Sequence, residues 1–159
     1  LRQTEETDDE DSSAESHEAM LAEAWNAPEG TIDVWWRGMK NGALMLLLAH
    51  LLHQNTEWRR NSIRVLRSVP TEEAVAQVRN HILDLAASSR IKVEPVVLVA
   101  DSLAESIQTA SKDAAIVMLG FDAPEEGEEG TFYERMEDLV GDLPRVLLVN
   151  SAGGMELES

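Results

Sequence analysis

The chain has 159 residues and a formal net charge of −17 at pH 7, from 30 acidic and 13 basic side chains. Its length suits one ordinary domain, and its hydrophobic content of 43% is typical of globular rather than disordered proteins. The absence of cysteine excludes disulfides and thiolate metal sites, and the acidic balance argues against binding to nucleic acid or directly to anionic lipid.

Residues 1–29 form an acidic segment that contains the run TEETDDEDSSAESHE. Blocks of like charge with few apolar residues do not bury enough surface to offset chain entropy, so we predict a partly disordered linker. Residues 14–25 leave two interpretations open, a short helix or further disorder. Because the chain starts at Leu1, with neither an initiator methionine nor a signal-peptide pattern, we expect it to be a piece of a longer protein.

From residue 30 onward, strand and helix patterns alternate. The run TIDVWW (31–36) predicts a strand, and ALMLLLAHLLHQ (43–54) predicts a helix that is apolar nearly all round. A membrane-spanning helix needs about 20 apolar residues. Since His50 interrupts this run, we expect a buried helix instead. SIRVLRSV (62–69) predicts a second strand, whose imperfectly polar face carries Arg64 and Arg67.

The second half of the chain continues the alternation. A helix with Thr71 as its cap is predicted after Pro70. VEPVVLVA (93–100) and AAIVMLGF (114–121) predict strands that are apolar on both faces. Between them, Asp101 and Ser102 are expected to cap the helix SLAESIQTASK. The remaining elements are an acidic loop DAPEEGEEG (122–130), a helix TFYERMEDLVG (131–141) and a last strand PRVLLVNS (144–151).

Three nearly all-apolar strands in this alternating pattern indicate a parallel sheet that is covered on both faces. We therefore predict an α/β domain over residues 30–154, with a three-layer Rossmann-like fold and a mainly parallel five-stranded sheet, followed by a tail at 155–159. The pattern does not determine the strand order. In such a fold, the carboxyl ends of the strands line one crevice.

Motifs that carry chemistry are scarce at these strand ends. Neither G-x-G-x-x-G nor G-x-x-x-x-G-K-[ST] occurs. The glycine-containing loop before Thr131 superficially resembles a phosphate nest, but its five carboxylates would repel a phosphate, so we interpret it as a solvated acidic loop. His50 and His53 share a helix face, yet no third ligand is positioned, so we predict neither a metal site nor a cofactor.

The sequence also offers no recognisable catalytic constellation. No G-x-S-x-G elbow is present, and no serine has an identifiable histidine and aspartate partner, so we predict no catalytic residues. Asp33 lies in a strand beside two tryptophans, and a buried carboxylate requires a partner. Arg37 and Arg64 are the candidates, and we favour a structural ion pair over an acid–base role.

The apolar helix and the tryptophans point to packing. Trp35 and Trp36 are expected to face opposite sides of their strand. A helix that is apolar all round must be covered on more than its sheet-facing side. We therefore expect part of its surface to meet a second copy or a neighbouring domain. The candidate interface residues are Met39, Leu44, Leu48 and Leu51.

In their order, these blocks resemble the cytoplasmic C-terminal domain of the cation-chloride cotransporters. The blocks that carry the resemblance are TIDVWW, ALMLLLAHLL, Trp58-Arg59-Arg60, SIRVLRSV, SLAESIQTASKDAAIVMLGF and DLPRVLLVNSAGG, over Thr31 to Gly154. The resemblance implies a non-enzymatic regulatory and dimerisation domain on the cytoplasmic face of a membrane transporter of the amino acid–polyamine–organocation superfamily. Such transporters move K⁺ or Na⁺ with Cl⁻. The implied partners are the transmembrane part of the same polypeptide and a second copy.

The chain also departs from that family. It is shorter than the animal domains, and its last strand ends in Asn150-Ser151, where relatives often have an arginine. Its compact, acidic character suggests a prokaryotic homologue that transports ions or amino acids.

The same resemblance implies a fold similar to the universal stress proteins, although their nucleotide-binding glycine motif is not matched. A nucleotide-sensing module is the alternative interpretation, and it rests on fold analogy. Its candidate residues at the strand ends are Arg37, Asp101, Gly120 and Asp122.

Overall fold

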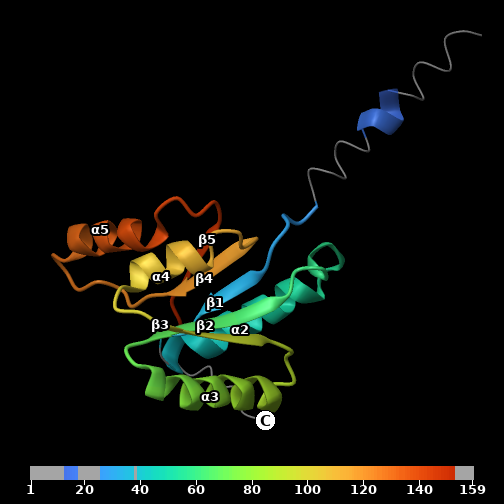
Figure 1. Ribbon diagram of the computed structural model, residues 1–159. Helices are drawn as coiled ribbons and strands as arrows, with labels where there is room; N and C mark the ends of the chain where they lie inside the picture. The colour runs from blue at the N-terminus through green and yellow to red at the C-terminus, as the bar shows by residue number, and fades with distance from the viewer. Residues whose placement is uncertain (1–12, 18–25, 38, 153–159) are drawn as a thin grey trace, which may run out of the picture.

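A parallel sheet in the order β3-β2-β1-β4-β5 runs through the computed structural model, which describes residues 13–17, 26–37 and 39–152 (Figure 1). Its strands are β1 (Ile32–Trp35), β2 (Ile63–Val69), β3 (Glu94–Val99), β4 (Ile116–Gly120) and β5 (Val146–Val149). All the strand pairings are parallel, and Ile32 of β1 lies in register with Ile63 and Ile116. The predicted α/β fold with a five-stranded parallel sheet is confirmed.

Helices cover both faces of this sheet. α2 (Met39–Gln54) and α3 (Val75–Ser88) pack on one face, whereas α4 (Leu103–Ala110) and α5 (Glu129–Val140) pack on the other (Figure 1). Two short 3₁₀ helices, η1 (Thr56–Trp58) and η2 (Glu72–Ala74), lie before β2 and α3. Each face has its own apolar core, one built around Met45 and Leu46 of α2 and the other around Ile107 of α4. This is the predicted three-layer arrangement.

The paired tryptophans divide between the two cores. Trp35 belongs to the core beneath α4 and α5, and Trp36 belongs to the core beneath α2 and α3, which confirms that they face opposite sides. The contact of Trp36 with α2 requires a glycine, because a Cβ atom at Gly42 would lie 2.5 Å from the indole ring. The first turns of α2 therefore sit directly on the tryptophan that follows β1.

Some predicted helix starts are wrong. α2 begins at Met39, four residues before the predicted start, because the polar side chains of Lys40 and Asn41 make tertiary contacts instead of breaking the helix. Thr71 makes no side-chain capping hydrogen bond, since a 3₁₀ turn intervenes before α3. At α4 the cap is Ser102, whose Oγ accepts from the backbone N–H of Glu105 at 3.3 Å.

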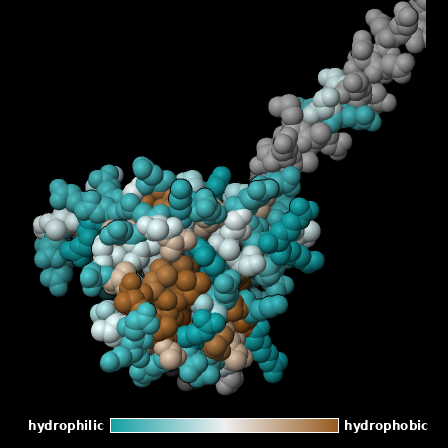
Figure 2. Space-filling view, in the orientation of Figure 1, coloured by the Kyte–Doolittle hydropathy of each residue, from teal (hydrophilic) through white to brown (hydrophobic). Residues whose placement is uncertain are grey.

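Both edge strands expose apolar side chains. VEPVVLVA was expected to be covered on both faces, yet β3 forms an edge of the sheet and Val99 is 44% exposed. Figure 2 shows the resulting apolar patch over β3, between α3 and α4. At the other edge, Leu147 and Leu148 of β5 are also exposed. An all-apolar pattern does not distinguish a central strand from an edge strand whose cover is supplied by something else.

The ends of the chain are described only in part. Residues 13–17 are helical, whereas 1–12, 18–25 and 153–159 lie outside the described residues, so the linker and the tail stay predictions. Within the described ranges, no helix has both the length and the apolar character required to cross a bilayer.

Candidate functional site

The sheet has a topological switch point between β1 and β4. After β1 the chain passes to α2 on one face, and after β4 it passes to α5 on the other, so the two exits diverge. Ligand sites in open parallel sheets form at this position, outside the carboxyl ends of the strands. Here the divergence leaves a cavity of about 250 Å³, which we call the switch-point cavity.

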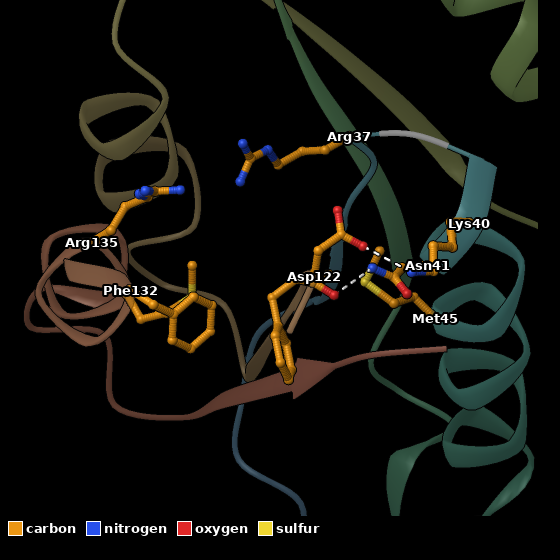
Figure 3. A pocket seen from close by; sticks show the side chains of 10 residues that line it. Arg37, Lys40, Asn41, Met45, Asp122, Phe132 and Arg135 are labelled. Atoms are coloured by element: carbon orange, nitrogen blue, oxygen red, sulfur yellow. Dashed lines mark hydrogen bonds and ion pairs between the residues drawn. The ribbon is translucent and has the colours of Figure 1, made fainter. Parts of the chain in front are cut away.

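Three parts of the fold supply the walls of the switch-point cavity. Arg37 follows β1, Lys40 and Asn41 come from the first turn of α2, and Asp122 lies two residues beyond β4 (Figure 3). The α5 helix closes the far side. The remaining lining residues are Met45, Gly120, Phe121, Phe132, Arg135 and Met136.

Asn41 fixes the geometry of this cavity. Its Nδ2 donates to the carbonyl of Phe121 at 2.9 Å, and its Oδ1 accepts from the backbone N–H of Ser151 at 2.7 Å. Gly120 makes room for it, because a Cβ atom there would lie 2.8 Å from the Cβ of Asn41. The start of α2 is therefore held against the exits of both β4 and β5.

The charge of the switch-point cavity is opposite in sign to that of the chain. Arg37, Lys40 and Arg135 are cationic and Asp122 is its single carboxylate, in a chain with a formal net charge of −17. Lys40 Nζ already lies 3.1 Å from Asp122 Oδ1. In the part of the chain that the structure describes, neither arginine has a hydrogen-bond or ion-pair partner.

The four candidates at the strand ends are distributed over two cavities. Arg37, Gly120 and Asp122 line the switch-point cavity, whereas Asp101 lines a separate one of about 350 Å³ with Arg67 and, again, Arg37. All four candidates therefore lie at the carboxyl edge of the sheet, as their positions after strands predicted, and their binding role stays a prediction.

The sequence did not indicate Lys40, Asn41 or Arg135. Arg135 reaches the switch-point cavity because it lies one turn beyond Phe132 on α5, and only the packing of that helix places this face over the strand ends. The sequence did show that Phe132 and Arg135 are three residues apart, a spacing that places two residues on the same face of a helix.

Asp33 belongs to a separate, buried network and not to this cavity. Arg64 donates to both of its carboxylate oxygens, from Nε at 2.8 Å and from a terminal nitrogen at 2.6 Å, so the predicted structural ion pair is confirmed with Arg64 as the partner. The hydrogen bond to Asp33 is the main cause that raises the pKa of Arg64 above its usual value, against the lowering effect of burial.

Two further side chains complete the network around Asp33. Thr31 donates to Asp33 Oδ1 at 2.6 Å, and Ser111 donates to Asp33 Oδ2 at 2.7 Å. Ser111 in turn accepts from the indole N–H of Trp35 at 2.9 Å. The carboxylate is fully buried and fully satisfied, which explains its place in an apolar strand and suits a structural role.

One histidine of the pair on α2, His53, has a structural contact. His53 Nδ1 lies 3.0 Å from the carbonyl of Asn61, at the end of the helix away from the switch-point cavity. Among the described residues, no group of three or more histidine, aspartate or glutamate side chains is arranged to hold a metal ion. The acidic loop from Glu125 to Glu129 is exposed to solvent.

The candidate interface residues differ in exposure. Leu51 is 58% exposed on the outer side of α2, whereas Leu44 and Leu48 are half-buried and pack partly against the core. Met39 is the first residue of α2, and its side chain lies outside the described part. Between Asn41 and Gln54 the helix carries no aspartate, glutamate, lysine or arginine on any side.

A family model matches most of the chain, over residues 2–140, and it describes SLC12, Solute carrier family 12. The match runs from the acidic segment through β1, the switch-point exits and α5, and it stops before β5. It agrees with the resemblance to cation-chloride cotransporters over the blocks that precede β5, and this is a family of transporters rather than enzymes. The chain therefore belongs to solute carrier family 12.

Proposed function

We propose that the chain is a non-enzymatic regulatory and dimerisation domain on the cytoplasmic face of a transporter of this family. The transporter would carry K⁺ or Na⁺ with Cl⁻, or an amino acid in a prokaryotic homologue. Family membership supports the transporter context, and the exposed apolar side chains of the α/β body suit a role in assembly.

The observation that carries this proposal is the outer surface of α2. A helix on the surface of an isolated domain normally presents charged side chains to water. α2 presents Leu51 with most of its side chain exposed and no formal charge along three turns, although charged residues make up 27% of the chain. An apolar helix face in so acidic a protein is best explained by a protein partner that covers it.

The patch over β3 supports a second contact. Its strand has the both-faces-apolar composition of a buried strand, but it forms an edge of the sheet. We assign the outer face of α2 to a second copy and the β3 edge to another part of the same polypeptide. Because such contacts have different free energies in different transport states, they would shift the equilibrium among those states.

Sedimentation of the 159-residue chain over a wide concentration range tests the self-association. We expect the mass to rise from 17.6 kDa toward that of a dimer, and Leu51→Glu to keep it at the monomer value. The variant should stay monomeric because dimerisation would bury the glutamate charge in an apolar contact, which is unfavourable. Leu83→Glu, at a leucine of α3 that is 41% exposed, is the matched control and should leave the dimer intact.

A chain that stays monomeric at the highest concentration would remove self-association from the proposal. In the complete transporter, Leu51→Glu is expected to change the transport rate while the amount of protein in the membrane stays constant. An unchanged rate would contradict the regulatory role of this surface.

A further inference from the structure

The switch-point cavity brings two arginines together without a carboxylate between them. Arg37 and Arg135 come from different elements on opposite sides of the cavity, and Figure 3 shows their side chains extending toward one another. Like charges that face each other repel, and the chain has 30 acidic residues from which a partner could have been supplied. An anion bound between the two guanidinium groups would offset this repulsion.

Nearby carboxylates do not fill this role. Asp122 is engaged by Lys40, on the α2 side of the cavity and opposite Arg135. Glu125 and Glu128 line a neighbouring cavity together with Arg135, yet no hydrogen bond or ion pair joins them to its guanidinium within the described residues. The four glutamates of the acidic loop are absent from the lining of the switch-point cavity.

We propose that the switch-point cavity binds a small phosphate-bearing molecule, with its phosphate held between Arg37 and Arg135. A guanidinium offers a planar pair of donors that matches two oxygens of a phosphate, so two of them can bind one phosphate from opposite sides. Asp122, which pairs with Lys40 and also lines the cavity, would accept a hydrogen bond from a hydroxyl group of the ligand.

The other walls define the size and polarity of the organic part. Phe121 and Phe132 form a tilted aromatic pair with ring centroids 5.5 Å apart, and Met136 lies beside them, so part of the wall is apolar. The cavity of about 250 Å³ is slightly smaller than most ligand sites, which commonly have volumes of about 300–1,000 Å³. This favours a small phosphomonoester over a dinucleotide.

Calorimetric titration of the 159-residue chain with inorganic phosphate and with glycerol 3-phosphate tests the proposal, with glycerol as the uncharged counterpart. We expect saturable binding of both phosphates at one site and no binding of glycerol. Arg37→Gln and Arg135→Gln should each weaken binding by at least about tenfold, since each removes a charge-assisted hydrogen-bonding group.

Arg145→Gln is the matched control, because it makes the same charge change just before β5, at the opposite end of the sheet. It should leave binding unchanged. Binding that is unsaturable, or that falls equally in all three variants, would overturn the proposal in favour of general charge attraction. Since Arg37 and Arg135 are exposed, both variants are expected to fold, and their circular dichroism and unfolding midpoints confirm this before titration.

A lipid headgroup presents the same phosphate chemistry, so vesicles of phosphatidylcholine with phosphatidylserine form a separate arm. We expect the chain to stay unbound, given its net charge. If the chain binds vesicles through both arginines but does not bind glycerol 3-phosphate, the proposal of a free small-molecule ligand would be wrong. The proposal is independent of self-association, since loss of phosphate binding leaves the Leu51→Glu result unchanged.

Discussion

Asp33 shows how one buried charge is accommodated in an apolar strand. Its carboxylate has no exposed surface, whereas the side chain of Arg64 retains 21% exposure, so the arginine connects the buried charge to the protein surface. The aspartate accepts from Thr31, Arg64 and Ser111, which replaces the water that it loses on folding. Removing either charge leaves the other without its partner.

Replacing Asp33 by asparagine is expected to lower the free energy of unfolding by about 3 kcal/mol, the low end for a broken buried pair, because Arg64 is partly exposed. Urea unfolding measures this change. Arg67→Met, on the same strand, is the control and should change stability by less than about 1 kcal/mol. Combining Asp33→Asn with Arg64→Met should cost less than the sum of the single changes, and strict additivity would contradict a coupled pair.

The raised pKa of Arg64 defines the pH dependence of this pair. A cationic group whose pKa is raised on folding contributes stability that is fully present below its unfolded pKa and is lost only as the pH rises through the folded pKa. Since arginine is already strongly basic, its contribution should be constant through neutral pH and disappear only in strong alkali.

At the scale of single elements, the two helix starts after β2 and β3 form a natural comparison. Ser102 caps α4 with a side-chain hydrogen bond, whereas Thr71 has extended backbone angles before η2 and makes none. Ser102→Ala is therefore expected to destabilise the chain by about 1 kcal/mol, and Thr71→Ala by much less. Thermal unfolding of the two variants measures the difference, and equal losses would show that the Ser102 hydrogen bond contributes little.

The sequence predicted which segments form strands and helices better than it predicted which segments lie next to one another. Alternating or continuous apolar patterns located every strand to within two residues at each end, because burial of one or both faces of a strand constrains its sequence locally. The strand order, and hence the edge position of β3, depends on contacts between distant segments that no local pattern encodes. For the same reason Arg37 and Asp122 were found from their positions after strands, whereas Arg135 depends on the packing of α5.

At the scale of the whole molecule, charge is distributed very unevenly. Only two ion pairs occur among the described residues, Lys40 with Asp122 and Arg64 with Asp33, so most of the acidic groups repel one another without compensation. The switch-point cavity is a small positive region within this negative surface. Such a contrast would guide a small anion toward the two arginines, and its range would shrink as salt is added.

Salt is therefore expected to stabilise this protein. Between about 0.01 M and about 1 M NaCl the screening length falls from about 30 Å to about 3 Å, which weakens the repulsion among surface carboxylates. We expect the midpoint of thermal unfolding to rise by about 2–4 °C, which corresponds to about 1 kcal/mol for a chain of this size. Replacing Glu125, Glu126, Glu128 and Glu129 by glutamine should reduce that rise. A midpoint that falls with salt would contradict net repulsion.

Asn41 has a mechanical consequence for the molecule. Because its side chain joins the carbonyl of Phe121 to the backbone N–H of Ser151, the start of α2 can shift only if one of these two hydrogen bonds breaks. These two hydrogen bonds therefore couple three segments: the beginning of α2, the exit of β4 and the residues that follow β5. A force applied to the chain beyond Ser151 would be transmitted to the wall of the cavity, and a change in that wall would be transmitted back.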